Sequence, residues 1–187
     1  PAGRRQGGPA PCSQIDHLMH SQGCRVLVEP DPGSGPYNMA VDEVLLESAL
    51  RHNRTTLRLY RWCEPTVSLG YFQDAAAAEA DSRFRSLAKV RRLSGGGALL
   101  HHHELTYSCA WSGTHALAAR PPGCYQAVAE QMVAVLQDRG IPAAMRGERL
   151  SERETRFLCF GRGDPRDVVV QGHKVLGSAQ RRRRGAV

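Results

Sequence analysis

The chain has 187 residues, of which 41% are hydrophobic and 23% charged, a composition typical of one globular domain with its own core. No run reaches the roughly 18 apolar residues that a membrane helix needs, and the opening segment has no signal-peptide-like stretch. We therefore expect a cytoplasmic protein that does not bind membranes. The net charge of +7 could indicate nucleic acid as a partner. No aromatic residues alternate with the arginines as stacking platforms, so we expect no nucleic-acid binding.

The cysteines and histidines predict no metal site. The six cysteines form no CxxC pair and have no regular spacing, which disfavours both a disulfide framework and a zinc ribbon. Residues 101–103 are three consecutive histidines, but neighbouring side chains on a strand point to opposite faces, so the three cannot converge on one ion. We expect reduced thiols.

The first part of the chain divides into an arm and the start of a domain. Residues 1–23 are rich in Gly, Pro and polar residues and predict a flexible N-terminal arm, which leaves residues 24–187 as one folded domain. A strand is predicted at 25–28. Asn38 is then expected to cap a helix. The apolar face of that helix is expected to contain Val41, Val44, Leu45 and Ala49.

The middle of the chain predicts several short strands and one short helix. The Ala-rich run at 75–85 favours the helix. The strands, which are rich in β-branched and aromatic residues, are predicted at 56–62, 66–71, 89–93, 98–101 and 105–111.

The clearest amphipathic helix is predicted at residues 124–139, with Gly140 as its stop signal. Its apolar stripe consists of Val128, Met132, Val135 and Leu136. A hairpin follows, in which a Gln171-Gly172 turn joins two strands. Strands and helices that mix without a βαβ rhythm predict an α+β fold with a mixed, largely antiparallel sheet flanked by helices.

Three segments could carry chemistry. Gly95, Gly96 and Gly97 have no Cβ, so their backbone N–H groups could approach a ligand closely, although a flexible turn explains a lone glycine run equally well. Lys174 follows the hairpin turn, where an isolated lysine is usually a solvated surface residue. Cys159 has apolar neighbours and would ordinarily be a buried thiol. A lysine folded against it would favour the thiolate and make it a nucleophile.

Four ordered motifs resemble one family. Residues 91–101 (RRLSGGGALLH), followed by ELTYS at 104–108, are similar to the signature of the lipoate-protein ligase and octanoyltransferase superfamily, which also contains biotin protein ligases. Residues 38–43, 57–73 and 172–181 resemble its first helix, its following strands and its catalytic strand. The resemblance implies a fold related to the catalytic domain of class II aminoacyl-tRNA synthetases.

The resemblance also implies which residues form the site. In cysteine-dependent octanoyltransferases a Cys-Phe pair precedes the catalytic-lysine hairpin, and Cys159-Phe160 resembles that arrangement. Cys159 and Lys174 are therefore expected to be catalytic, with Lys174 contacting the acyl carbonyl. The expected substrate-binding residues are Arg92, Ser94, Gly95, Gly96, Gly97, His101, Gly177, Ser178 and Ala179.

The function implied by the resemblance is octanoyl transfer from acyl carrier protein, via a cysteine thioester, to a lysine of a lipoyl domain or of glycine cleavage H protein. This reaction needs no cofactor. An ATP-dependent lipoate-protein ligase, which would need ATP and Mg²⁺, and a lipoyl amidotransferase are the alternatives, and a non-catalytic lipoyl- or nucleic-acid-binding module is the third. The sequence departs from the transferase pattern at two positions: His102 replaces the usual aspartate, and Gly97 stands where many such transferases carry arginine, a feature closer to the ligases. The C-terminal part of the acyl pocket is expected to be missing, which would make the chain a fragment.

Overall fold

The computed structural model describes residues 23–119, 121–147 and 163–187. These ranges contain the helices α2 (Gly35–His52), α3 (Ala75–Ala80) and α4 (Pro121–Asp138) and the 3₁₀ helix η1 (Ala116–Ala119). Their strands are β1 (Cys24–Val28), β2 (Thr55–Tyr60), β3 (Thr66–Leu69), β4 (Ala88–Arg91), β5 (Leu99–His101), β6 (Thr106–Ala110), β7 (Ala143–Met145), β8 (Val168–Val170) and β9 (His173–Leu176). The arm predicted at 1–23 lies outside the described residues except for Gly23.

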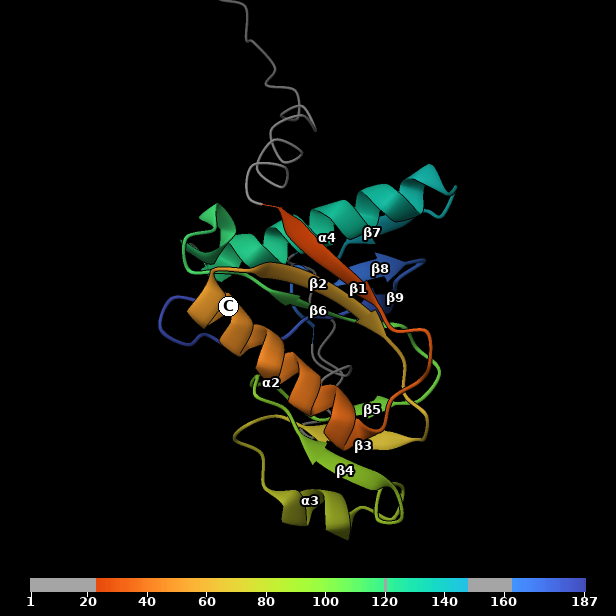
Figure 1. Ribbon diagram of the computed structural model, residues 1–187. Coiled ribbons are helices and arrows are strands. Elements are labelled where there is room, and N and C mark those ends of the chain that lie inside the picture. Colours follow the sequence, from red (N-terminus) through yellow and green to blue (C-terminus); the bar gives the residue numbers. More distant parts are fainter. Residues whose placement is uncertain (1–22, 120, 148–162) are drawn as a thin grey trace, which may run out of the picture.

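The nine strands of the described ranges form three sheets of three, in the orders β1-β2-β6, β4-β3-β5 and β7-β8-β9 (Figure 1). The pairs β1-β2 and β3-β4 are parallel, whereas the other four pairs are antiparallel. This confirms the α+β class with mixed, largely antiparallel strands, which are divided among three sheets. Strand β7, which has only three residues, was not predicted.

Helix α2 starts earlier than its sequence suggested. The Ser34 hydroxyl accepts a hydrogen bond from the backbone N–H of Tyr37 at 3.5 Å and caps the helix. The prediction of Asn38 as the cap was wrong, because this residue is fully buried inside the helix. Its side-chain amide donates to the carbonyl oxygens of Gly33 and Arg61, each at 3.2 Å. Asn38 therefore ties the start of α2 to the loop after β2.

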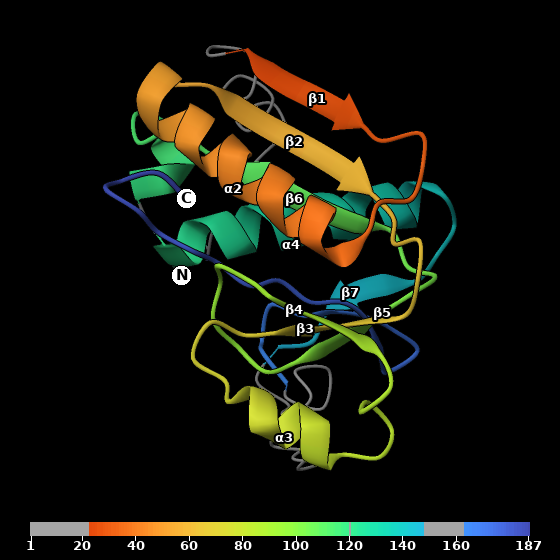
Figure 2. The ribbon, with the colours of Figure 1, turned by 60° about the horizontal axis from the view of Figure 1, so that its bottom comes forward.

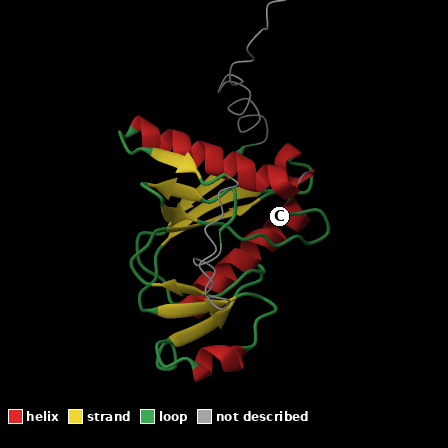
Figure 3. Cartoon of the chain, turned by 180° about the vertical axis from the view of Figure 1, so that it is seen from behind, coloured by secondary structure: helices red, strands yellow, loops and turns green. Residues whose placement is uncertain are grey.

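The two long helices cover opposite faces of the β1-β2-β6 sheet (Figures 1 and 3). On one face, Leu45 and Ala49 of α2 pack in a buried cluster with Ala110 of β6. The neighbouring Cys109 points to the other face, because side chains alternate along a strand. It packs in a cluster with Val128 of α4. Strand β6 is thus the layer between the two helices.

The buried faces of both helices differ from the predicted apolar stripes. Val44 of α2 is 64% exposed and Val135 of α4 is 54% exposed, so their assignment to the buried faces was wrong. Met132 and Leu136, by contrast, pack against the buried Val168 of β8. Among the described residues, no helix combines the length and apolar character required to cross a bilayer.

The β4-β3-β5 sheet forms a separate layer that carries the glycine loop between β4 and β5. Figure 2 shows α3 beneath this sheet, on the side away from α2. Ala78 of α3 packs there with Val67, Phe84 and Ala98 in a buried cluster. Gly70, just after β3, approaches the loop so closely that an added Cβ would lie 2.0 Å from the carbonyl oxygen of Gly96. The loop is therefore packed against β3.

The arginine-rich segment after β9 is held against the rest of the molecule. Val187 exchanges two backbone hydrogen bonds with Trp111, at 2.6 and 3.1 Å. Arg182 donates to the carbonyl oxygen of Ala118 at 2.6 Å, and Arg183 forms an ion pair with Glu47. Two arginines of this basic segment, Arg182 and Arg183, are thus bound to other parts of the chain.

Candidate active site

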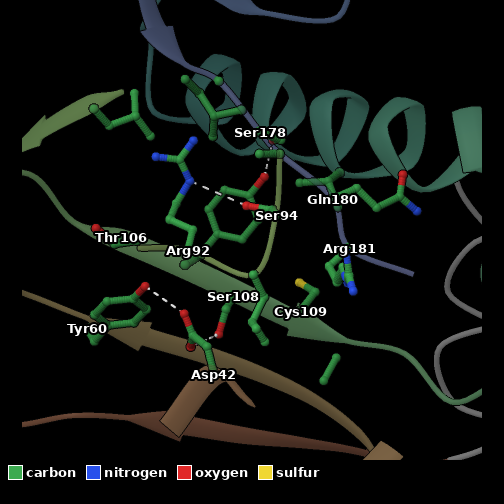
Figure 4. Close-up of a pocket in the computed structure, with 18 of the residues that line it drawn as sticks. Asp42, Tyr60, Arg92, Ser94, Thr106, Ser108, Cys109, Ser178, Gln180 and Arg181 are labelled. Carbon is green, nitrogen blue, oxygen red and sulfur yellow. Dashed lines mark hydrogen bonds between the residues drawn. The ribbon is translucent and has the colours of Figure 1, made fainter. Parts of the chain in front are cut away.

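A cavity of about 550 Å³ lies between α2, β6, α4 and the segment that follows β9 (Figure 4). This volume is within the range of small-molecule sites in proteins. Much of its wall is apolar and comes from Leu45, Leu46, Leu99, Leu105, Val128 and Leu176. The cavity therefore collects side chains from segments that are far apart in the sequence.

Most of the predicted site residues meet at this cavity. Those that line it are Arg92, Ser94, His101, Gly177, Ser178 and Ala179. Gly95, Gly96, Gly97 and Lys174 are not part of its lining. Lys174 nevertheless lies directly beside the lining residue Gly177, because a Cβ added to that glycine would be 2.5 Å from Lys174 Cε. Cys159 lies outside the described residues.

Arg92 shapes the glycine loop. Its Nη1 donates to the carbonyl oxygen and the hydroxyl of Ser68, at 2.6 and 2.8 Å. Its Nη2 donates to the carbonyl oxygens of Gly95 and Gly97, at 3.1 and 2.8 Å. A planar guanidinium suits this role because its donors have a fixed fork geometry. The predicted substrate-binding arginine thus uses these donors to hold the loop.

His101 stands at the centre of a second network beside the same loop. Its Nε2 lies 2.7 Å from the Ser68 hydroxyl and its Nδ1 lies 2.5 Å from Glu104 Oε1. Its ring stacks on Trp62 with centroids 4.0 Å apart. The order Ser68-His101-Glu104 has the form of a nucleophile triad. Ser68 is fully buried, however, so the network serves to orient the His101 ring at the cavity wall.

Glu104 is the charged member of this network. Burial alone would raise its pKa, but the hydrogen bond to His101 and the backbone N–H of His102 hold the pKa at about 2. The carboxylate is therefore ionised at neutral pH and accepts hydrogen bonds from the end of β5. His102 and His103 are exposed, and their rings lie against each other at a tilt of 31°, with centroids 3.6 Å apart. Within the described ranges, no three His, Cys, Asp or Glu side chains are arranged to hold a metal ion.

A polar group on α2 closes one side of the cavity, and the sequence analysis did not assign it to the site. Asp42 accepts hydrogen bonds from the Tyr60 hydroxyl at 2.9 Å and from the Ser108 hydroxyl at 2.7 Å (Figure 4). It also accepts one from Arg58 Nη1 at 3.0 Å. Burial, together with the nearby Asp42 charge, raises the pKa of Tyr60. The cavity therefore has a polar group at Asp42, close to the apolar Leu45 and Leu46 of the same helix.

Two hydroxyls connect β6 to the segment after β9. Tyr107 and Ser178 are hydrogen-bonded to each other (Figure 4), and both line the cavity. Burial raises the pKa of Tyr107 to about 12, although the hydrogen bond with Ser178 opposes the shift. The phenol is therefore a neutral group at physiological pH. Only the ELTYS motif pointed to this part of β6, and Tyr107 itself was not predicted.

Cys109 also lines the cavity, but its thiol is unsuited to nucleophilic attack. Burial raises its pKa to about 12, so the thiol stays protonated at neutral pH. Cys124, also in the lining, has a raised pKa for the same reason and donates to the carbonyl oxygen of Leu117. The four cysteines of the described ranges, which do not include Cys159, are free thiols.

Lys174 is buried with a carboxylate. Its Nζ lies 2.9 Å from Oδ1 of Asp167, and the two side chains are 7% and 3% exposed. The expectation that Lys174, taken as an isolated lysine, is a solvated surface residue is therefore wrong. Asp167 was not predicted as a site residue, although a hairpin with a Gln171-Gly172 turn places it within a few residues of Lys174 across the strands.

Comparison with known proteins identifies the family. A model of the lipoyl protein ligase A/B catalytic domain matches residues 34–187. Octanoyltransferase LipM of Moorella thermoacetica is 40% identical over 164 residues, which cover 82% of this chain and 59% of that protein. Octanoyltransferase LipM of Carboxydothermus hydrogenoformans is 39% identical over 155 residues, with 80% and 57% covered. The chain thus spans about three-fifths of the length of these curated relatives.

Solved structures of lipoate protein ligases are similar in fold to this chain. A lipoate-protein ligase A bound with ATP superposes with a TM-score of 0.68 at 25% identity, covering 88% of this chain and 63% of that one. A bi-partite lipoate protein ligase from Thermoplasma acidophilum gives a TM-score of 0.63 at 25% identity, with 88% and 58% covered. These likenesses support the expected class II synthetase-like fold. On the match over residues 34–187, the chain belongs to the lipoyl protein ligase A/B catalytic-domain family.

Proposed function

We propose that this chain catalyses octanoyl transfer from acyl carrier protein, through a thioester on Cys159, to a lysine of a lipoyl domain or of glycine cleavage H protein. The observation that carries the proposal is the largely apolar cavity of about 550 Å³ whose wall includes Gly177, with the buried Lys174 ammonium directly beside that glycine. An apolar chain and a reacting carbonyl need these two environments next to each other.

The apolar wall suits the acyl chain. Leu45, Leu99 and Leu176 come from three different elements and give the cavity apolar surface on several sides. Burial of one methylene contributes about 0.8 kcal/mol, so the six methylenes of an octanoyl chain would contribute roughly 5 kcal/mol.

The reaction is a pair of acyl exchanges. The Cys159 sulfur attacks the carbonyl carbon of the donor thioester, the bond to the carrier sulfur breaks, and the Cys159 proton leaves on the carrier thiol. The amine of the acceptor lysine then attacks the acyl-cysteine, the C–S bond breaks, and a proton passes from nitrogen to the Cys159 sulfur. Neither step consumes ATP. A cation such as Lys174 would stabilise the thiolate and the oxyanion of each tetrahedral intermediate.

The relatives support this choice over ATP-dependent ligation. The curated relatives described above are octanoyltransferases at 39–40% identity, whereas the ATP-bound ligase is 25% identical. The ligase reaction would require ATP and Mg²⁺ to activate a free acid and would not require Cys159. Dependence on ATP and dependence on Cys159 therefore separate the two reactions.

Intact-protein mass spectrometry of the full-length protein tests the proposal. Incubation with octanoyl-acyl carrier protein should give an octanoyl adduct that hydroxylamine removes. The adduct should be absent in Cys159→Ala, while Cys109→Ala, which removes a cavity-lining thiol of raised pKa, should keep it. Activity of Cys159→Ala with ATP and free lipoate, in the absence of any wild-type adduct, would overturn the proposal in favour of a ligase.

A further inference from the structure

The environment of Lys174 assigns a role to a residue that sequence reasoning passed over. We propose that Asp167 is a positioning residue that fixes the Lys174 ammonium beside Gly177 and the cavity. The catalytic part of this inference rests on the proposed function, whereas the positioning itself rests on geometry. The Lys174 Nζ to Asp167 Oδ1 distance is 2.9 Å, and the Asp167 side chain is only 3% exposed.

A bulge in the β8-β9 ladder determines which residue of the chain after β9 lies opposite Asp167. Val169 pairs with Lys174, but Val168 pairs with Leu176, so the register shifts between these two pairs and β9 carries one extra residue. The shift places Asp167, which precedes Val168, opposite the residue after Leu176. Bulges of this kind re-aim side chains and are frequent beside active sites.

The face of the sheet also follows from this register. Val168 packs with residues of α4, so Val169 and its partner Lys174 point to the opposite face, because side chains alternate along a strand. Asp167 is on the same face as Val169 for the same reason. Lys174 therefore lies on the face away from α4 together with its carboxylate.

Gly177 completes the arrangement. An added Cβ at this position would lie 2.5 Å from Lys174 Cε and 2.8 Å from its Nζ. The lysine side chain thus passes over the glycine, in the space that any other side chain would fill. Since Gly177 lines the cavity, the ammonium lies directly beside a residue of the cavity wall.

Asp167 is itself held by several contacts. Its backbone N–H donates to the carbonyl oxygen of Asp164 at 3.0 Å, and its carbonyl oxygen accepts from Arg146 N at 2.8 Å. Its Oδ2 accepts from the backbone N–H of Asp164 at 2.9 Å. These bonds fix the carboxylate so that Oδ1 faces Lys174. A lysine side chain by itself has many rotamers, and an ion pair with an immobile carboxylate restricts it to few of them.

The Asp167 carboxylate has a second cation beside it, in addition to Lys174. Oδ2 of Asp167 also lies 3.5 Å from Nε of Arg146, so one carboxylate stands between two cations. The neighbouring Asp164 is paired with Arg166 at 2.8 Å. The single Asp167 carboxylate thus faces two positive charges, those of Lys174 and Arg146, and still holds the lysine through the ion pair at 2.9 Å.

The two lysines of this chain, Lys89 and Lys174, allow a direct test. The folded protein receives a trace of isotopic acetic anhydride, is denatured and fully acetylated with the second isotope, and is digested for mass spectrometry. The Lys174 to Lys89 labelling ratio reports the availability of the Lys174 amine. Asp167→Asn should raise this ratio about tenfold, because a buried ammonium without its carboxylate turns towards solvent.

Asp164→Asn is the matched control, since its side chain is 49% exposed and its partner is Arg166. It should leave the ratio unchanged. An unchanged ratio in a folded Asp167→Asn protein would overturn the proposal. If Asp167→Asn does not fold, both lysines should label faster to the same extent. The test of positioning is then Asp167→Glu, which keeps the negative charge but moves it by one methylene. It should slow octanoyl transfer about tenfold at unchanged donor KM; a wild-type rate would contradict positioning.

The labelling does not require acyl transfer. A raised ratio in Asp167→Asn with no octanoyl adduct on the wild-type protein would retain the positioning of Lys174 and reject the proposed function. An adduct on the wild type with an unchanged ratio in Asp167→Asn would do the reverse.

Discussion

Two buried cations flank the cavity, and their surroundings differ. Arg92 donates to the carbonyl oxygens of Ser68, Gly95 and Gly97, all neutral acceptors. Lys174 faces the carboxylate of Asp167 and passes over Gly177. The guanidinium with its rigid fork fixes the shape of a loop, whereas the ammonium is a compact charge held at one point. Both positions were predicted as site residues from motifs alone, and only the contacts separate a structural cation from one suited to catalysis.

Truncation of Arg92 should have the largest effect on stability. Arg92→Ala leaves the buried carbonyl oxygens of Ser68 and Gly97 without their donor, which should lower the free energy of unfolding by roughly 3 kcal/mol or more. Arg92→Lys should restore little of this stability, because one ammonium cannot reach all the oxygens to which the guanidinium donates. Urea unfolding of the three proteins measures this. A stable, inactive Arg92→Ala would instead place Arg92 on the substrate.

The glycine loop offers a matched pair of substitutions. Gly70→Ala puts a Cβ 2.0 Å from the backbone oxygen of Gly96 and should cost about 2–3 kcal/mol, since a backbone cannot yield cheaply. Gly95→Ala meets no atom within 4 Å and should be neutral or stabilise by up to about 1 kcal/mol. Thermal unfolding compares them. Equal losses would show that the loop does not pack on β3 as described.

Gly177→Ala should separate activity from stability on the lysine side. The new Cβ meets Lys174 Cε at 2.5 Å, and this flexible side chain can move aside. We expect the melting temperature to change little and octanoyl transfer to fall roughly 10–100-fold, because the ammonium is displaced. Single-turnover assays and a thermal melt check both parts. Full activity would mean that the position of Lys174 does not matter.

Glu104→Gln should have the smallest effect, visible in the pH dependence of stability. The pKa of Glu104 lies at about 2, below the ordinary 4.5, so its contribution to stability is present above pH 4.5 and is lost as the pH falls towards 2. The side chain is 40% exposed, so the contribution should stay below about 1 kcal/mol. Urea unfolding at pH 6 and pH 3 should show wild type and variant converging at the lower pH.

Much of the fold was predictable because local patterns decide it. The hairpin at Gln171-Gly172 formed as predicted, with positive φ angles of 49° and 80° at the two turn residues. The cap of α2 was predicted wrongly because Asn38 has a partner at Arg61, which only the folded chain brings near. Helix periodicity also could not show that Val44 and Val135 face solvent, since burial depends on where neighbouring elements lie.

The site was predictable where motifs mark it and not where charges meet across elements. The resemblance identified Lys174, which lies beside the cavity-lining Gly177, and the glycine loop, of which Ser94 lines the cavity. It did not identify Asp42 of α2 as a site residue. The hydrogen-bond partners of Asp42 are Tyr60 on β2 and Ser108 on β6, which only the folded chain brings near. Asp167 was the one omission that the sequence could have supplied, from the register of the hairpin.

The most direct test of the central claim is a single-turnover transfer assay without ATP. Full-length protein, octanoyl-acyl carrier protein and a lipoyl domain are mixed, and the mass of the lipoyl domain is followed. We predict a gain of one octanoyl group on one lysine of the acceptor, abolished by Cys159→Ala and slowed about 10²–10³-fold by Lys174→Ala. An acceptor that gains mass only when ATP and a free acid are supplied would contradict the account.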